Sequence, residues 1–437
     1  MQGPTLGQPA QTASVQASSK TSTFKLIVAT SLGNGLEIFD FTVYSFFAMY
    51  IGAAFFPAHD PLTSLLLAVG TFGAGFFARP LGAILIGSYA DRIGRRSAMT
   101  LTIWLMALGT AAIGLCPTYA QIGLGAPLIV LCGRLLQGFS AGGEVGASTT
   151  LLAEAGPIRR RGFMISWQMT SQGIAATSGA LMGLILSRTL APADLASWGW
   201  RVPFVLGLLI APVGYYIRRK LPDQHERAAG TSLVEFPIRE LVTRYRAQLL
   251  TAIFMILSGT VSTYTLVYFL PSYLSRVMHL PPTIAFAAAL VASVIIVCAS
   301  PIAGVLADRV TRRRNLALVL AIISSCCTLP AFWLITHGAT SATVLVVIAV
   351  MVALMVIGTG NGMFMIMEAF PSTVRASGFA IAYAVSVTLF GGTAQFVVTA
   401  LVAHTHEPFA AGGYVFICNV VSLLAIFAYR ERWRVMA

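Results

Sequence analysis

The chain has 437 residues, of which 57% are hydrophobic and 10% are charged, and its mean hydropathy is +0.81. Soluble globular proteins have a charged fraction of about a quarter, so this composition excludes that class and predicts a polytopic membrane protein. The formal net charge of +13 would suit a nucleic-acid-binding protein. The basic residues gather at the ends of apolar runs, however, so we expect a lipid bilayer as partner and no nucleic acid.

Apolar runs of about 20 residues recur along the chain, and in lipid such runs form helices because each backbone donor and acceptor must be satisfied within its own segment. A closed barrel would alternate apolar and polar residues instead. We therefore predict an all-α membrane protein with twelve transmembrane helices. The expected helices cover residues 24–52, 62–88, 97–116, 126–152, 162–187, 201–219, 248–270, 283–306, 315–336, 343–367, 375–403 and 412–429.

The predicted helices divide into two six-helix halves. Residues 1–23, rich in Gln, Ser, Thr and Ala, lack the features of a signal peptide and are expected to be a disordered tail. The N-terminal half covers 24–219, a basic cytoplasmic linker covers 220–247, the C-terminal half covers 248–430, and 431–437 form a short tail. With both termini in the cytoplasm, most Lys and Arg fall on cytoplasmic segments, as the positive-inside rule requires.

Two carboxylates, Glu37 and Asp40, lie in the middle of the first apolar run. An intramembrane acid costs on the order of 2.5–3.5 kcal/mol on insertion scales, so it usually faces the bundle interior or an aqueous pathway and has a partner. Asn34 and Tyr44 share their helix face, which should therefore look inward. We interpret this face as half of a proton-coupling site; the alternative is a carboxylate capped by a neighbouring helix for structure alone.

Two arginines, Arg79 and Arg134, are also predicted within the membrane, and Arg134 shares its helix face with Gln137 and Glu144. Because an arginine keeps its proton, it must be paired at all times. Our hypothesis is that Asp40 pairs with Arg134 in the empty site, and that protonation of Asp40 frees Arg134 to bind a substrate carboxylate. Arg79 is the candidate for a second carboxylate, which favours a di- or tricarboxylate over a zwitterion.

The proton is expected to be exchanged at Asp40, with Glu37 and Glu144 as further candidates. Neighbouring acids titrate as a coupled unit, so either one could accept the proton or tune the other. Protons are the expected coupling ion, and sodium stays open as an alternative.

Neutral polar residues complete the expected substrate site. The fifth helix carries a stripe suited to hydroxyl or carboxylate oxygens, although these side chains could equally bond to other helices. The spans of the second half are poor in charge, so we expect that half to provide shape, aromatic walls and hydrogen bonds. The residues concerned are Gln168, Ser171, Gln172, Tyr264, Tyr268 and Asn361.

Repeated charged motifs predict two cytoplasmic gates. The run from Asp91 to Arg96 recurs in part from Asp308 onwards. The residues around Glu154 recur around Glu368, at nearly the same distance along the chain. Two markers at one period indicate parallel repeats. The short turn needs a glycine, and its aspartate can accept bonds from a helix terminus or basic group; membrane anchoring of the arginines is the alternative. The predicted gate residues are Asp91, Arg92, Gly94, Arg95, Arg96, Glu154, Asp308, Arg309, Glu368 and Arg375.

We expect no metal, other cofactor or disulfide framework, because the six cysteines lie in or at the ends of apolar helices without metal-ligand spacing. The sequence also has no nucleotide-binding loop and no nucleophile–base arrangement, so an enzyme is not expected.

The loop GSYADRIGRR at 87–96 resembles the signature between helices 2 and 3 of the major facilitator superfamily. The runs GNGLEIFDF at 33–41, RPLGA at 79–83 and GRLLQGFSAGGE at 133–144 are similar to the metabolite:proton symporters. The pattern at 166–172 most resembles the citrate and tricarballylate branch of that family.

This resemblance implies the major facilitator fold, a bacterial inner membrane location and charged site residues at the intramembrane acids and arginines named above. It also implies uptake of a carboxylate, most closely citrate or tricarballylate, together with protons by alternating access, in a chain that we expect to be monomeric. The alternatives are symport of 2-oxoglutarate, shikimate, another carboxylate or a betaine-like solute, and a non-transporting nutrient receptor.

Overall fold

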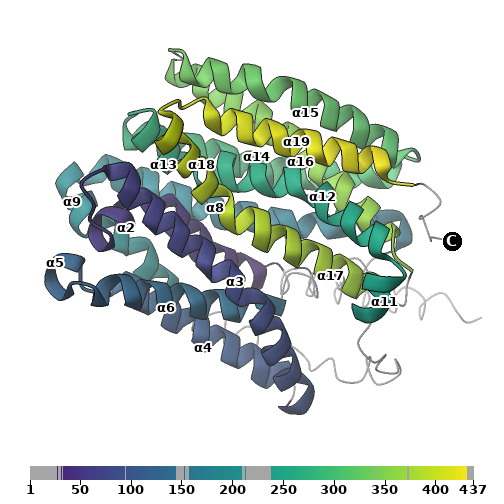
Figure 1. Cartoon of the computed structure of the whole chain (residues 1–437), viewed down its shortest axis with the longest axis horizontal. Helices are drawn as coiled ribbons and strands as arrows, with labels where there is room; N and C mark the ends of the chain where they lie inside the picture. The colour runs from purple at the N-terminus through teal and green to yellow at the C-terminus, as the bar shows by residue number, and fades with distance from the viewer. Residues whose placement is uncertain are drawn as a thin grey trace, which may run out of the picture.

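The structure is a computed structural model that describes residues 27, 31, 33–93, 95–143, 152, 157–208, 212, 238–338, 340–371 and 374–430. All regular structure in these ranges is helical, and the long helices run roughly parallel to one another (Figure 1). The predicted tails 1–23 and 431–437 and most of the predicted linker lie outside the described residues. Gly94, Glu144 and Glu154 also lie outside them, so their predicted roles stay predictions.

The first half of the chain begins with a helix over Gly33–Phe46 that continues, after a bend of 64°, as α2 (Ala48–Phe55). The elements that follow are α3 (Pro61–Ile93), α4 (Arg95–Gly114), α5 (Tyr119–Ile122), α6 (Gly125–Ser140), η1 (Ala141–Gly143), η2 (Ile158–Arg160), α8 (Arg161–Thr189), α9 (Pro192–Ser197), η3 (Gly199–Arg201) and a helical segment at 202–208.

The second half contains long α-helices interrupted by three π-helical segments. Its elements are α11 (Ile238–Thr243), α12 (Arg246–Thr263), the π-helix η5 (Tyr264–Tyr268), α13 (Leu270–Ser272), the π-helix η6 (Tyr273–Val277), α14 (Pro282–Arg309), α15 (Arg313–Thr336), α16 (Ser341–Glu368), α17 (Arg375–Ser386), the π-helix η7 (Val387–Gly391), α18 (Gly392–Thr405) and α19 (Ala410–Ala428).

Eight helices are long and apolar enough to cross a membrane, and the bent pair at the start makes a ninth span. Two shorter apolar helices cover Thr100–Gly114 and Gly125–Ser140. Each predicted span thus has a helical counterpart, except that only 202–208 and 212 are described in the predicted span 201–219. The predicted all-α membrane fold is confirmed.

The ends of these helices follow local chemistry. The Asp60 carboxylate accepts the backbone N–H groups of Leu62 and Thr63, and Pro61 occupies the first helical position of α3, where the missing N–H costs nothing. At the other end, α3 runs to Ile93, beyond the predicted end at 88, and Pro80 lies inside it. The segment expected to be a loop before position 94 is therefore helical.

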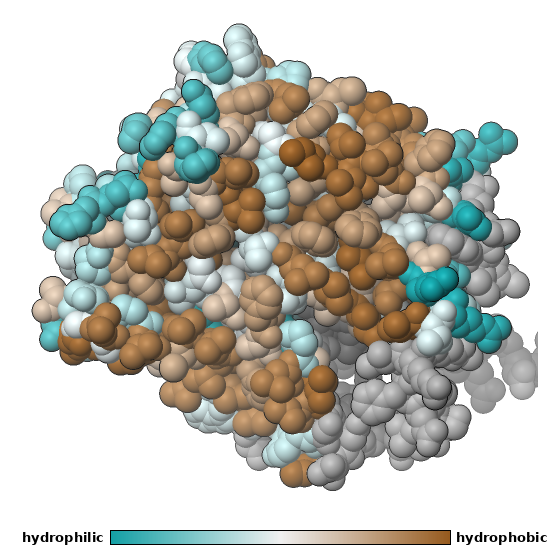
Figure 2. Space-filling model, in the orientation of Figure 1, coloured by the Kyte–Doolittle hydropathy of each residue, from teal (hydrophilic) through white to brown (hydrophobic). Residues whose placement is uncertain are grey.

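The two ends of the bundle are polar and its middle is apolar. Figure 2 shows a broad hydrophobic surface between hydrophilic groups at the left and right edges. We call these edges the α9 end, where α5 and α9 lie, and the α11 end, where α11 and the end of the described chain lie (Figure 1). Large side chains such as Trp104, Leu424 and Phe427 are exposed, as expected where lipid replaces water.

Close backbone contacts hold the helices together. A Cβ added to Gly138 on α6 would lie 1.7 Å from the carbonyl oxygen of Gly75 on α3, so only glycine allows this approach. Between the two halves, α8 packs along α14 and α3 packs along α18. A Cβ on Gly304 of α14 would lie 2.6 Å from the carbonyl oxygen of Gly162 on α8.

Candidate functional site

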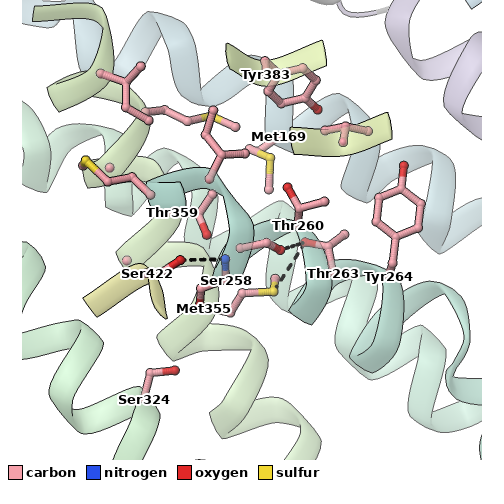
Figure 3. A pocket seen from close by; sticks show the side chains of 18 of the residues that line it. Met169, Ser258, Thr260, Thr263, Tyr264, Ser324, Met355, Thr359, Tyr383 and Ser422 are labelled. Carbon is pink, nitrogen blue, oxygen red and sulfur yellow. Dashed lines mark hydrogen bonds between the residues drawn. The ribbon is translucent and has the colours of Figure 1, made fainter. Parts of the chain in front are cut away.

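A cavity of about 90 Å³ lies among α12, α15, α16, α17 and α19, and the first helix, α3 and α8 complete its wall. This volume is enough for several waters. Figure 3 shows that most of its lining is neutral. Hydroxyl groups, thioethers and tyrosine rings share the lining with aliphatic side chains. The labelled lining residues are Met169, Ser258, Thr260, Thr263, Tyr264, Ser324, Met355, Thr359, Tyr383 and Ser422.

Arg79 is the one cation in the cavity wall among the described residues. It is 7% exposed, and its guanidinium carbon lies 4.3 Å from the ring centroid of Phe76 and 4.5 Å from that of Phe41. Its Nε and Nη2 atoms have no hydrogen-bond partner in the part of the chain that the structure describes. A buried guanidinium with unused donors beside a cavity suits a carboxylate, which it can bind through two parallel hydrogen bonds.

Arg134 lies deeper, outside the cavity wall, in a cage of aromatic rings. Its guanidinium carbon is 4.5 Å from the ring centroids of Phe41 and Tyr44 and 4.7 Å from that of Phe72. The side chain is fully buried. Phe41 contacts both arginines, and the α3–α6 contact at the glycines brings them into this common cluster. Such rings stabilise a buried cation through their negative faces.

Asp40 and Arg134 are joined through two other side chains. Arg134 Nη1 donates to Gln137 Oε1 at 2.8 Å, Gln137 Nε2 donates to Thr110 Oγ1 at 2.9 Å, and Thr110 Oγ1 donates to Asp40 Oδ2 at 2.7 Å. Within the described residues no ion pair connects the two charges directly. The hypothesis was that Asp40 pairs with Arg134 in the empty site, whereas in this conformation the side chains of Gln137 and Thr110 lie between the two charged groups.

Glu37 lies one helical turn from Asp40 and is 5% exposed. Its carboxylate is close enough to Tyr264 and Tyr383 to act on them electrostatically, as is Arg79. Glu37 is therefore nearer to the cavity residues, whereas Asp40 faces α4 and the segment 202–208.

The other predicted substrate residues divide into two groups. Gln172, Tyr264 and Tyr268 line the cavity with Arg79. The remaining ones bond to other parts of the protein: Tyr44 donates to the Ala68 carbonyl, Asn34 bonds with Gln168 and Ser171, and Asn361 donates to the Arg313 carbonyl.

Asp308 is the predicted gate residue with the clearest contact. At the α11 end its Oδ1 accepts the backbone N–H of Gly162 at 2.7 Å, and its Oδ2 accepts that of Phe163 at 2.9 Å. These are free N–H groups at the start of α8, where a carboxylate is favoured. A residue of the second half thus caps a helix of the first.

A second contact at this end lies within the second half. Arg313 forms a salt bridge with Glu368, and its guanidinium carbon lies 4.2 Å from the Phe364 ring centroid. Arg309 is exposed, and Arg375 donates to the Phe370 carbonyl. The side chains of Asp91, Arg92, Arg95 and Arg96 lie outside the described part of the structure, so the first gate stays a prediction.

A third contact ties the halves on the α9 side. Gln395 Nε2 on α18 donates to Ser45 Oγ at 2.6 Å, and Ser45 Oγ donates to the Tyr268 carbonyl in η5 at 3.0 Å. The cavity is therefore bounded by polar contacts between the halves towards both ends of the bundle.

The sequence prediction missed Thr110, Tyr383, Ser324 and Ser422. A threonine in a membrane helix commonly bonds to the carbonyl four residues before it, so Thr110 carries no signal of a further role. Tyr383 lies in an apolar stretch without a charged neighbour. Of the described residues, no group of three or more His, Cys, Asp or Glu could hold a metal ion.

A bundle of apolar helices with buried charges beside a cavity that both halves line is typical of a multi-pass membrane transporter. The chain belongs to the Major Facilitator Superfamily, whose model matches residues 30–394. This confirms the superfamily that the sequence motifs indicated.

Known transporters are similar in sequence to this chain over nearly its whole length. A citrate-proton symporter of Klebsiella pneumoniae is 35% identical over 412 residues, which are 93% of this chain and 91% of the relative. A proline/betaine transporter of Escherichia coli (strain K12) is 32% identical over 93% of this chain and 83% of its own. A crystal structure of a D-xylose-proton symporter matches with a TM-score of 0.74 at 18% identity, covering 93% of this chain and 97% of that one, and shows the shared fold.

Proposed function

We propose that this protein takes up an organic acid together with protons, by alternating access, and that the acid is a tricarboxylate such as citrate or tricarballylate. The observation that carries a carboxylate substrate is Arg79, whose Nε and Nη2 donors have no partner among the described residues and which lies in the cavity wall. The similarity to a citrate-proton symporter supports a tricarboxylate among the carboxylates.

The charges of the site suit symport. Glu37, Asp40, Arg79 and Arg134 are all buried, and when all four are ionised their charges cancel. Protonation of one acid leaves a net positive charge, which an incoming carboxylate neutralises. An uncompensated buried charge is costly. Proton and substrate therefore bind better together than either binds alone.

The roles follow from the positions. Arg79 binds one substrate carboxylate, while Gln172, Tyr264 and Tyr268 contact the rest of the molecule. Asp40 exchanges the proton, and Glu37 tunes the site or provides a second proton acceptor. Arg134 remains inside its aromatic cage as the counter-charge that responds to Asp40.

Alternating access follows from the contacts between the halves. Release of the Asp308 contact opens the cavity at the α11 end, and release of the Ser45 contact opens it on the α9 side. We assign the α11 end and both termini to the cytoplasm of a bacterial cell, with the protein as a monomer in the inner membrane. The coupling ion is the proton, and the sodium alternative is tested by uptake in sodium-free buffer.

The test is citrate uptake in proteoliposomes under an imposed pH gradient. The variant Asp40→Asn should lose accumulation driven by the gradient while keeping exchange of labelled for unlabelled citrate. Asp60→Asn, which changes an exposed acid outside the bundle, serves as the control and should behave like the wild type. Full gradient-driven accumulation by Asp40→Asn contradicts the coupling role, and absence of exchange by the wild type indicates a receptor that does not transport.

A betaine-like zwitterion is the second candidate. The cavity wall combines Arg79, which suits a carboxylate, with the rings of Tyr264, Tyr268 and Tyr383, which suit a quaternary ammonium group through cation–π contact. The similarity to a proline/betaine transporter points the same way. Thermal stabilisation by citrate, tricarballylate, 2-oxoglutarate, shikimate and betaine separates the candidates, and Arg79→Gln should abolish stabilisation by the true substrate.

A further inference from the structure

The hydroxyl group of Thr110 occupies an unusual position beside Asp40. Its oxygen lies 2.7 Å from Asp40 Oδ2, 3.0 Å from the carbonyl oxygen of Met106, and 2.9 Å from Gln137 Nε2. The residue is 1% exposed, so water does not compete for these bonds. A hydroxyl has one hydrogen and two lone pairs, and it therefore cannot donate to Asp40 and Met106 at the same time.

This geometry provides a complete set of bonds for either state of the acid. When Asp40 is ionised, Thr110 donates to the carboxylate and accepts from Gln137. When a proton from water binds at Oδ2, the new O–H donates to Thr110, whose own hydrogen turns to the Met106 carbonyl. Thr110 still accepts from Gln137 with one lone pair of its oxygen and now accepts from Asp40 with the other. No buried polar group of this row therefore loses its partner.

We propose that Thr110 is a positioning residue that reverses its hydrogen bond when Asp40 is protonated and passes this change through Gln137 to Arg134. The inference deepens the proposed function and rests on Asp40 as the proton carrier. Gln137 holds both neighbours, since its Oε1 accepts from Arg134 and its Nε2 donates to Thr110. Thr110 accepts from Gln137 in both states, so the change reaches the guanidinium group as a changed polarisation of this row of hydrogen bonds.

The surroundings of the acid are consistent with this role. The charged and titratable groups around the row are Arg134 from α6, Arg79 from α3, Tyr264 from η5, and Glu37 and Tyr44 from the helix that carries Asp40. The segment 202–208 has no charged or titratable side chain, and a Cβ at its Gly207 would lie 2.9 Å from Asp40 Oδ1. Thr110 is the described side chain that donates a hydrogen bond to Asp40.

The experiment is the pH dependence of citrate uptake by the full-length protein in proteoliposomes. Thr110→Val keeps the shape but removes the hydroxyl, so ionised Asp40 loses a charge-assisted bond that is stronger than the neutral bond lost by its protonated form. The midpoint of the profile should move towards alkaline pH by about one pH unit. Thr110→Ser restores the hydroxyl and should restore the wild-type profile.

Thr170→Val is the matched control. Thr170 is also buried and also donates to the carbonyl four residues before it, Ser166, at 3.0 Å, but it forms no hydrogen bond with an acid among the described residues. Its profile should stay at the wild-type midpoint. If Thr110→Val does not fold, as judged by its melting temperature in detergent, Thr110→Ala removes the same hydroxyl without the second methyl group and replaces it.

The outcomes separate this inference from the proposed function. An unshifted profile for folded Thr110→Val or Thr110→Ala, with Asp40→Asn uncoupled, overturns the role of Thr110 and leaves Asp40 as the proton carrier. Full coupling in Asp40→Asn overturns the proposed function itself. A shift in Thr110→Val that Thr110→Ser reverses, with Asp40→Asn uncoupled, supports both.

Discussion

Asp308 of α14 caps the first turn of α8 by accepting the backbone N–H of Gly162 through Oδ1, while its Oδ2 accepts that of Phe163. The capped helix belongs to the first half of the chain and the acid to the second. The proposed opening at the α11 end would break this contact, so its strength would add to the stability of the conformation in which it is made.

We predict that Asp308→Ala favours opening at the α11 end. Losing a helix cap costs about 1 kcal/mol, which corresponds to an approximately five-fold rise in the open population. The measurement is the alkylation rate of Leu320→Cys, a cavity-lining position on α15, in a background without native cysteines. Asp308→Asn keeps one acceptor oxygen and should show a smaller rise. An unchanged rate in Asp308→Ala contradicts the gate.

Ser45→Ala should act in the opposite direction. The substitution removes the acceptor of Gln395 and the donor to the Tyr268 carbonyl, and leaving buried polar groups unpaired costs about 1–3 kcal/mol. Opening on the α9 side should raise the alkylation rate of Met278→Cys, at the residue that follows η6, without raising that of Leu320→Cys. Equal rises at both reporters would show general loosening instead of a gate.

The two buried arginines should respond differently to lysine. Arg79→Lys removes the bidentate donors at the cavity and should raise the KM for citrate by about 10–100-fold, since a hydrogen bond to a charged group contributes about 1.5–3 kcal/mol. Arg134→Lys should leave KM nearly unchanged and alter the pH dependence of uptake. If Arg134→Lys raised the KM as much as Arg79→Lys does, the result would indicate that Arg134 binds substrate directly.

Gly207 should be intolerant of a side chain because its Cβ position lies 2.9 Å from Asp40 Oδ1 and 3.7 Å from Thr110 Cγ2. Gly207→Ala displaces the carboxylate from the Thr110 hydroxyl, and overpacking of this kind costs about 1–3 kcal/mol. We expect a drop in gradient-driven citrate uptake of about ten-fold. Gly413→Ala, which meets no atom within 4 Å, is the control, and equal activity of the two variants would contradict the prediction.

The sequence predicted the helical spans and the buried charges well because both depend on local composition. A run of apolar residues crosses lipid as a helix wherever it occurs, and acids such as Glu37 and Asp40 within such a run must face inward. Spacing also placed Asn34 and Tyr44 on the same face as these acids. These inferences need no knowledge of which helix lies opposite.

Pairing between helices was the part that the sequence did not determine. Asn361 is a polar residue in a membrane span and was therefore predicted to contact substrate, yet it donates to the Arg313 carbonyl. Thr110 looks like an ordinary helical threonine, yet it bonds to Asp40. A helix face reveals that a side chain points inward but not which of several inward-pointing partners it meets, because that depends on contacts such as the one between Gly75 and Gly138.

The π-helical segments η5 and η7 lie next to the cavity, where Tyr264, Tyr268 and Val387 line it. A π turn contains one more residue than an α turn, so each segment adds one residue to a turn of an otherwise continuous α-helical span. Converting one turn to α geometry would rotate the following helix by about 100° and advance it by about 1.5 Å. Such a conversion would change the side chains that the second half presents to a substrate without exposing backbone groups to lipid.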